Sequence, residues 1–313
     1  MDDDAAAAAR EANRRAPLAA FNGDAPSAPR WYRDAVAVEP ATSRVTVAGA
    51  ALECLTWGDA GKPGLLFLHG NGAHAGWWRF VAPFFAASHR VAAFSWSGMG
   101  GSDHRDAYTI EGFADELFAV AEACGLGVKP IVVAHSFGGF PTMFAAHTQG
   151  QRLRGAVIID TPFREAGEPR GQPSNATNRP HKVYATLEEA LGRFRLVPEQ
   201  GAKHLFIVDM IARGSLVAVA GGWSWAFDPY LWHRFDAGES PRILEAPHCP
   251  VALVWGARSL LMPPERAART LARLPAGTPG IEIPDAAHHV MVDQPLAFVA
   301  ALRGLFERWP GAS

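Results

Sequence analysis

The heptapeptide VAHSFGG, residues Val133–Gly139, carries the strongest structural signal in the chain. It follows the apolar residues IV and precedes FPTMFAAH, a segment that suits a helix. A serine at a sharp strand-to-helix turn projects toward substrate, and small residues two places on either side let that turn close. Ala134 and Gly138 occupy those places around Ser136, so the stretch predicts a nucleophilic serine. An ordinary tight turn is the alternative.

Short apolar runs recur on both sides of this serine. The runs are LLFLHG (65–70), VAAFSW (91–96), IVVAHS (131–136), AVIID (156–160), VALVWG (251–256) and IEIP (281–284). Such runs without polar alternation are typical of strands buried on both faces of a parallel sheet. Upstream, residues 44–49 and 51–57 predict an antiparallel pair, and residues 111–124 and 295–309 have helical spacing. The sequence therefore predicts an α/β fold with a mostly parallel sheet.

One long segment, from Pro162 to Pro250, interrupts the alternation of strands and helices. It opens rich in Pro and Gly, and then shows helical patterns at 186–196 and 202–216. A structureless loop of that length is uncommon in a compact domain, so we expect an inserted helical subdomain. The expected organisation is an N-terminal arm (1–30), a core (31–162 and 247–313) and a helical cap (163–246).

Composition narrows the choice of partners and compartment. The formal net charge of −2 over 313 residues gives no electrostatic reason to expect nucleic acid or an anionic membrane as a partner. The three cysteines, Cys54, Cys124 and Cys249, have neither disulfide-framework nor metal-ligand spacing, which favours a reducing compartment. No signal peptide or membrane-spanning run is evident. We expect a cytoplasmic protein with a small-molecule substrate and no cofactor, and a homodimer remains open.

A glycine-rich turn, HGNG at residues 69–72, directly follows the first of the apolar runs. Acyl transfer places negative charge on the carbonyl oxygen, and fixed backbone N–H groups stabilise that charge. The N–H of Asn71 and that of Phe137, the residue after the serine, are the candidate donors. A plain turn is the alternative for this motif too.

The candidate base lies near the end of the chain, in PDAAHHVMVDQP. His288 and His289 follow the last predicted strand, and a neutral imidazole there can take the serine proton and return it to a leaving group. Two adjacent histidines also invite a metal-site interpretation. No spaced Asp, Glu or Cys accompanies them, so we expect no metal.

Together these motifs resemble the α/β-hydrolase superfamily. The matching stretches are HGNG, SGMGGSD after the fourth strand, AHSFGG after the fifth, and H-x4-D-Q-P near the end. The resemblance covers residues 44–309 and is nearest to the capped branch of esterases, C–C bond hydrolases, haloalkane dehalogenases and epoxide hydrolases. It implies the α/β-hydrolase fold and selects His288, because Asp293 and Pro295 stand at the spacing typical of the family's catalytic histidine. A serine in place of the dehalogenase aspartate implies acyl chemistry through an acyl-enzyme.

The acid that orients the histidine departs from the family pattern. The resemblance implies an aspartate in a stretch like WGxxD, but here WGARS places Ser259 at that position, and Glu265 lies too far into the next helix. Some haloalkane dehalogenases carry the acid at the end of the strand before the cap, where this chain has Asp160. We expect Asp160 to be the acid. A degenerate site or a different acidic residue remains the alternative.

Aromatic residues are the candidates for the substrate pocket. They are Trp77, Trp78, Trp223, Trp225, Phe227 and Trp232, and core packing is the competing explanation for each. Arg164 and Arg258 are candidates for recognising a substrate carboxylate. The leading hypothesis is a serine hydrolase for a small or medium carboxylic ester. The rivals are a C–C bond hydrolase of aromatic degradation and a ligand-binding protein that has lost catalysis.

Overall fold

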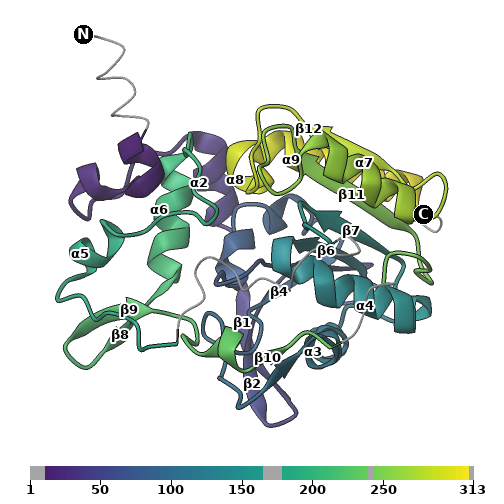
Figure 1. Cartoon of the computed structure of the whole chain (residues 1–313), viewed down its shortest axis with the longest axis horizontal. Helices are drawn as coiled ribbons and strands as arrows, with labels where there is room; N and C mark the ends of the chain where they lie inside the picture. Colours follow the sequence, from purple (N-terminus) through teal and green to yellow (C-terminus); the bar gives the residue numbers. More distant parts are fainter. Residues whose placement is uncertain (1–10, 165–177, 239–242, 310–313) are drawn as a thin grey trace.

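An eight-stranded sheet forms the centre of the computed structural model, which describes residues 11–164, 178–238 and 243–309 (Figure 1). Its strand order is β1-β2-β4-β3-β6-β7-β11-β12, and only β2 runs antiparallel to its neighbours. The strands are β1 (Ala41–Val47), β2 (Ala50–Trp57), β3 (Gly64–Leu68), β4 (Arg90–Phe94), β6 (Ile131–His135), β7 (Gly155–Ile159), β11 (Val251–Gly256) and β12 (Gly280–Ile283). The predicted α/β fold is thereby confirmed.

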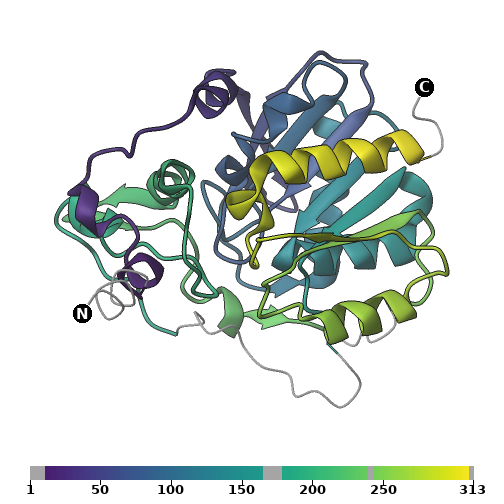
Figure 2. The ribbon, with the colours of Figure 1, turned by 90° about the horizontal axis from the view of Figure 1, so that it is seen from above.

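Helices cover both faces of this sheet (Figure 2). They are α2 (Arg30–Val36), α3 (Ile110–Ala123), α4 (Gly139–Gln149), α7 (Pro264–Arg273), α8 (Val290–Asp293) and α9 (Pro295–Arg308). The apolar side chains of α3, α4 and α7 pack on one face, and those of α9 pack on the other. Strands β3, β6, β7 and β11 are buried along their whole length, which explains their uninterrupted apolar sequence.

Between β7 and β11 lie residues 163–246, which we call the insertion. Its described residues hold α5 (Leu187–Leu191), α6 (Leu205–Gly214), the hairpin of β8 (Leu216–Val219) and β9 (Gly222–Trp225), and β10 (Phe235–Asp236), which pairs with β5 (Tyr108–Thr109). The insertion is thus less helical than expected. The helix predicted at 186–196 stops before Gly192, and Gly221 and Gly222 supply the positive φ angles that close the hairpin. Residues 165–177 and 239–242 lie outside the described part.

The N-terminal arm was expected to lie outside the core as an arm or a frayed helix, and its described part, from residue 11, is partly buried. Leu18 is only 2% exposed and belongs to the main hydrophobic cluster. The Asn13 side chain exchanges two hydrogen bonds with the backbone of Ala202, and Arg213 donates to the carbonyl of Gly23 at 2.6 Å. The arm therefore packs on the insertion (Figure 2). Isolated apolar residues such as Leu18 carry no periodic signal, so sequence reasoning missed this contact.

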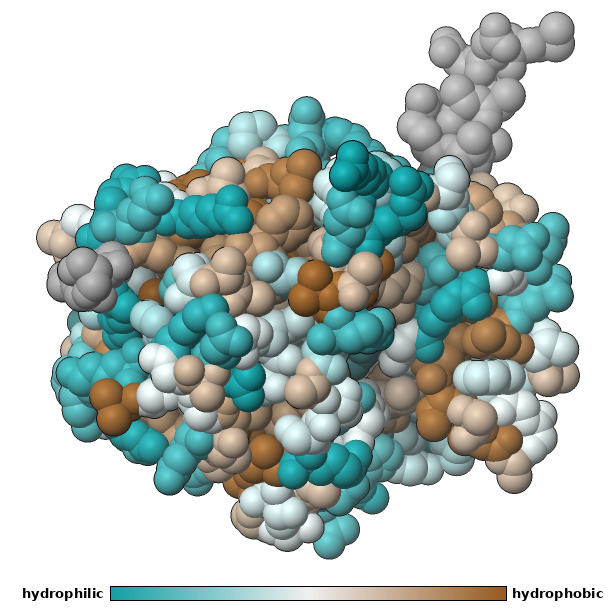
Figure 3. Space-filling model, turned by 180° about the vertical axis from the view of Figure 1, so that it is seen from behind, coloured by the Kyte–Doolittle hydropathy of each residue, from teal (hydrophilic) through white to brown (hydrophobic). Residues whose placement is uncertain are grey.

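The surface on the side opposite to that of Figure 1 is a mixture of polar and apolar side chains (Figure 3). Apolar patches are scattered among the polar groups over this face (Figure 3). Val217 and Val219 of β8 are 45% and 39% exposed. None of the helices in the described ranges is both long enough and apolar enough to cross a membrane.

Candidate active site

Ser136 stands at the sharp turn between β6 and α4. Its φ angle is +51°, in the left-handed region that a non-glycine residue enters only under strain. Thr161 holds the turn, because its Oγ1 donates a 2.8 Å hydrogen bond to the Ser136 carbonyl. A Cβ atom on Gly138 would lie only 2.7 Å from the His69 carbonyl oxygen, so a larger residue would push the turn apart. Ser136 itself is partly exposed.

The structure brings Ser136, His288 and Asp160 into one hydrogen-bonded chain. Nε2 of His288 lies 2.9 Å from Oγ of Ser136, and Nδ1 lies 2.7 Å from Oδ1 of Asp160. A carboxylate oxygen can only accept, so Nδ1 carries the proton and Nε2 is left to accept from the serine hydroxyl. The histidine and aspartate side chains are almost completely buried. This arrangement can remove a proton from the serine and stabilise the imidazolium that results.

Asp160 follows β7 with a φ angle of +48°, which turns its side chain toward the end of β11. Its Oδ2 accepts a 3.0 Å hydrogen bond from the backbone N–H of Gly256, and its Oδ1 accepts one of 2.6 Å from Oγ of Ser259. With His288, three donors replace the water that this fully buried carboxylate has lost. Ser259, at the place where the family resemblance implied an acid, is therefore the neighbour of Asp160.

The HGNG turn runs directly beside the serine, since a Cβ atom on Gly70 would lie 3.0 Å from Cβ of Ser136. His69 fixes this turn: its Nδ1 donates to the Gly70 carbonyl at 2.7 Å, while its Nε2 accepts from the Trp96 N–H. Burial lowers the pKa of His69 to about 3, which keeps the ring neutral. The two hydrogen bonds then favour the tautomer with its proton on Nδ1. The Gly70 carbonyl faces His69, so the N–H of Asn71, on the same planar peptide, points away from that ring.

Two further side chains support the loop that carries His288 and His289. His135 donates from Nε2 to the His288 carbonyl at 3.0 Å, and the ring of Trp77 lies 5.4 Å from that of His289. Burial lowers the pKa of both His135 and His289 well below the usual value, and the nearby His288 ring adds to this. Both rings are therefore neutral, which limits the positive charge beside the candidate base.

Gln200 of the insertion clamps the same loop, and sequence reasoning missed it. Its Oε1 accepts from the backbone N–H of His289 at 3.1 Å and from Nδ1 of that ring at 2.8 Å. Its Nε2 donates at 3.0 Å to Oδ2 of Asp293, which also accepts from the N–H of Ala287. Burial raises the pKa of Asp293. A single glutamine in an irregular segment has no sequence signal that could have revealed this role.

The candidate pocket residues are dispersed. Trp78 is 1% exposed and stacks on Phe67 of β3, so it belongs to the core and not to a pocket wall. Trp223 and Trp225 pack within the insertion, and Phe227 packs on His181. Trp77 and Trp232 are the two that lie beside the site, at His289 and Asn71 respectively.

Of the two arginines considered for a substrate carboxylate, Arg258 pairs with Asp285 at 2.8 Å and is largely exposed. Arg164 accepts through its backbone carbonyl from Arg273. In the described ranges no group of three or more His, Cys, Asp or Glu side chains is arranged to hold a metal ion.

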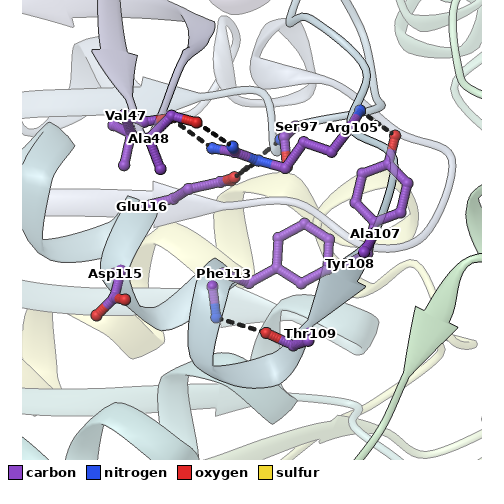
Figure 4. Close-up of a pocket in the computed structure, with 11 residues that line it drawn as sticks. Val47, Ala48, Ser97, Arg105, Ala107, Tyr108, Thr109, Phe113, Asp115 and Glu116 are labelled. Atoms are coloured by element: carbon purple, nitrogen blue, oxygen red, sulfur yellow. Dashed lines mark hydrogen bonds and ion pairs between the residues drawn. The ribbon is translucent and has the colours of Figure 1, made fainter.

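A small cavity of about 170 Å³ lies elsewhere, beside the start of α3 (Figure 4). Arg105 crosses it, pairing with Glu116 at 3.0 Å and donating to the carbonyls of Val47 and Ala48. Burial raises the pKa of Glu116, and the ion pair with Arg105 opposes that shift. Ser136, His288 and Asp160 do not line this cavity. Its charged pair ties the β1–β2 turn to α3.

Comparison with known proteins agrees with the fold and the motifs. A family model described as "Alpha/beta hydrolase family" matches residues 65–302. Methylesterase 9 of Arabidopsis thaliana is 37% identical over 98 residues, covering 30% of this chain and 38% of that protein. A haloalkane dehalogenase of Mycolicibacterium smegmatis is 33% identical over 109 residues, covering 33% and 34% respectively. Epoxide hydrolase 1 of Caenorhabditis elegans is 24% identical over 76% of this chain and 63% of its own length. The matches thus span between about a third and two thirds of these relatives.

Solved structures give the same result at the level of the fold. The thioesterase domain from the curacin biosynthetic pathway superimposes with a TM-score of 0.73 at 18% identity, covering 84% of this chain and 99% of that domain. E-2-(acetamidomethylene)succinate hydrolase superimposes with a TM-score of 0.68 at 19% identity, covering 86% and 99%. The family match extends over most of the chain, and the sheet order and the serine turn agree with it. The chain belongs to the alpha/beta hydrolase family.

Proposed function

We propose that this protein is a serine hydrolase that cleaves a small or medium carboxylic ester through an acyl-enzyme. The observation that carries the proposal is the unbroken hydrogen-bonded chain from Ser136 through His288 to Asp160. Each link has the distance and donor direction that nucleophilic catalysis requires.

In the first half of the reaction, Oγ of Ser136 attacks the ester carbonyl carbon while Nε2 of His288 takes the hydroxyl proton. Asp160 stabilises the imidazolium. The N–H groups of Asn71 and Phe137 stabilise the oxyanion of the tetrahedral intermediate. The intermediate collapses when the bond to the alcohol oxygen breaks, and His288 returns its proton to that oxygen. The alcohol leaves and the acyl group stays on Ser136.

In the second half, a water molecule attacks the acyl-enzyme and His288 takes the proton of that water. The second tetrahedral intermediate collapses by breaking the bond to Oγ of Ser136, which regains its proton from His288. The carboxylic acid is released and the site returns to its starting state. No redox step or cofactor is needed for this balance.

The surroundings of the serine favour an apolar acyl group, with the insertion acting as a cap. Phe137 contacts Phe140, Trp232 and Phe235 at ring separations of 6.4, 5.4 and 6.0 Å. Aromatic side chains beside a nucleophile favour apolar ligands over charged ones. Arg258, engaged with Asp285 at the surface, is not available to bind a substrate carboxylate. This weighs against the C–C hydrolase alternative, and the contacts of Asp160 weigh against a degenerate site.

Labelling with a fluorophosphonate tests the proposal, with Ser136→Ala as the matched control. We expect the wild-type protein to be labelled at Ser136 and the variant to remain unlabelled. A panel of p-nitrophenyl esters of increasing chain length, run beside a dienol ring-cleavage substrate, then separates ester from C–C hydrolysis. Absence of labelling under conditions where a known esterase reacts would exclude the serine hydrolase. Turnover of the dienol alone would favour the alternative.

A further inference from the structure

One side chain of the insertion contacts both residues to which we assign the oxyanion donors. Nε1 of Trp232 donates a 3.1 Å hydrogen bond to Oδ1 of Asn71. The ring of the same tryptophan lies edge-on to Phe137, with the ring centroids 5.4 Å apart at an angle of 90°. Asn71 belongs to the turn after β3, whereas Phe137 belongs to the short helix η4 (Ser136–Gly138) after β6. Trp232 therefore contacts both of the loops that follow the neighbouring strands β3 and β6.

Trp232 is in turn held firmly against the core. It lies in η6 (Leu231–His233), and its ring packs edge-on against Phe235 at 5.1 Å. Asp228, four residues earlier, anchors this part of the insertion: its N–H donates to the Gly98 carbonyl at 2.7 Å, and its Oδ2 accepts from the Tyr108 hydroxyl at 2.8 Å. The tryptophan thus has a fixed position from which to constrain its two partners.

We propose that Trp232 is a positioning residue for the oxyanion site, and that the seating of the insertion on the core thereby sets the rate of acyl transfer. This inference rests on the proposed function. Donors stabilise an oxyanion when they lie about 2.7–3.1 Å from the position that it occupies in the tetrahedral intermediate, and a small displacement of a donor lowers the rate. A bond to Asn71 and a ring contact with Phe137 limit how far the two donors can separate. An acyl group that displaces the insertion would lose rate as well as affinity.

The experiment removes the hydrogen bond from either end. Trp232→Phe keeps an aromatic ring against Phe137 but lacks Nε1–H, and Asn71→Ala keeps the backbone donor but lacks Oδ1. We expect each variant to lower kcat/KM for the best ester by about tenfold, mainly through kcat, because transition-state stabilisation is lost. The double variant should be no slower than the worse single variant, since both remove the same bond. Trp31→Phe is the matched control, because Trp31 contacts Phe84 and Phe206 and neither oxyanion residue.

Inhibitor affinity distinguishes positioning from packing. Oγ of Ser136 adds to the carbonyl carbon of a trifluoromethyl ketone, and the adduct carries an oxyanion. The corresponding methyl ketone binds without this addition, and its carbonyl carbon stays trigonal. Trp232→Phe should weaken the fluorinated inhibitor by the same factor as kcat/KM and leave the methyl ketone unchanged. The inference would be overturned if the loss of kcat/KM in the double variant were the product of the losses in the two single variants. It would also be overturned if Trp232→Phe lowered the melting temperature but left the affinity for the fluorinated inhibitor unchanged. If the wild type neither hydrolyses esters nor is labelled at Ser136, the proposed function itself fails. That result is distinct from the two outcomes that would overturn the role of Trp232.

Discussion

Oγ of Ser259 donates a 2.6 Å hydrogen bond to Oδ1 of Asp160, the oxygen that also accepts from Nδ1 of His288 at 2.7 Å. The serine hydroxyl is itself oriented, because Oγ accepts from the backbone N–H groups of Leu261 and Met262 at 3.2 and 3.1 Å. Because both N–H groups point at the lone pairs of Oγ, the hydroxyl proton of Ser259 is free to bond the carboxylate of Asp160. The position that the family resemblance assigns to the acid thus holds a partner of the acid.

Replacing Asp160 with Asn should lower kcat by about 10³- to 10⁴-fold with little change in KM, as loss of the acid does in serine proteases. The amide preserves the shape of the site, but it cannot stabilise the imidazolium and can favour the wrong tautomer of His288. Steady-state kinetics on a p-nitrophenyl ester measure the effect. Asp285→Asn, which alters only the exposed pair with Arg258, is the control. Near-normal turnover in the Asp160 variant would show that another group serves as the acid.

Removing the hydroxyl of Ser259 should have a smaller and more specific effect. In Ser259→Ala, Oδ1 of Asp160 loses one of its two donors and its negative charge becomes more available to His288. The imidazolium is then better stabilised, so the low-pH limb of the kcat/KM profile should move to higher pH. We expect kcat to fall by about threefold to tenfold, because Asp160 has lost one of the bonds that fix its position and holds His288 less precisely. A pH–rate profile unchanged from that of the wild type would mean that the hydroxyl serves only to hold its own loop.

Moving the carboxylate back to position 259 should restore activity lost at position 160. In Ser259→Asp alone, two carboxylates would share one buried site, and we expect a less stable protein because like charges repel there. In the double variant with Asp160→Asn, the new carboxylate has one neutral neighbour and lies near the same imidazole. We expect at least a tenfold gain in kcat over Asp160→Asn, reflecting recovered stabilisation of the imidazolium. A double variant no faster than Asp160→Asn would show that position 259 cannot reach Nδ1.

The pH dependence of stability should reflect the buried neutral histidines. Burial lowers the pKa of His69, His135 and His289, whereas in the unfolded chain each titrates near 6.5. Below that pH the unfolded state binds more protons, so the free energy of unfolding decreases as the pH falls below about 6.5. Each histidine contributes a slope of up to about 1.4 kcal/mol per pH unit. The raised pKa of Asp293 acts in the opposite sense, because the folded state then keeps a proton that the unfolded chain has released.

Urea unfolding at pH 7.5, 6.0 and 5.0 checks this expectation. His135→Gln keeps a donor for the His288 carbonyl but cannot titrate, so its slope should be shallower by about one proton. His233→Gln, at an exposed position, is the control. A slope in His135→Gln equal to that of the wild type would mean that this ring binds a proton as readily in the folded state as in the unfolded chain.

The elements that could be predicted from the sequence are those whose signals come from residues close together in the chain. The strands buried on both faces have uninterrupted apolar sequences, and the turn at Ser136 needs small neighbours at fixed offsets. His288 could be selected because Asp293 and Pro295 follow it at a known spacing. Asp160 was harder, since its contact with the histidine spans 128 positions and depends on neighbouring strands of a sheet.

The contacts made by the insertion could not be predicted in this way. Trp232 looked like any other aromatic residue in a Trp-rich segment, and only the fold places its Nε1 against Asn71. Trp78, from the same motif as Trp77, turns into the core because its ring stacks on Phe67. Where the insertion sits on the core is decided by such single side-chain contacts, which carry no periodicity in the sequence.

Gln200 offers the sharpest test of the link between the insertion and the histidine loop. Gln200→Ala leaves the backbone N–H and the Nδ1 of His289 buried without a partner, and Oδ2 of Asp293 keeps only the Ala287 N–H, which should cost about 2–4 kcal/mol of unfolding free energy and lower kcat. Gln200→Glu behaves differently. Its carboxyl still accepts from His289, but it faces Oδ2 of Asp293, whose pKa burial already raises.

The two carboxyl groups in Gln200→Glu must share a proton to keep their bond, so the folded state holds a proton that the unfolded chain loses. Stability should therefore be close to wild type near pH 5 and should fall as the pH rises through the folded-state pKa of the pair, whereas the deficit of Gln200→Ala should show no such added loss at high pH. Chemical unfolding and ester turnover across this range measure both effects. A pH-independent deficit in Gln200→Glu would mean that residue 200 and Asp293 do not interact, and the proposed clamp on the His288 loop would then be wrong.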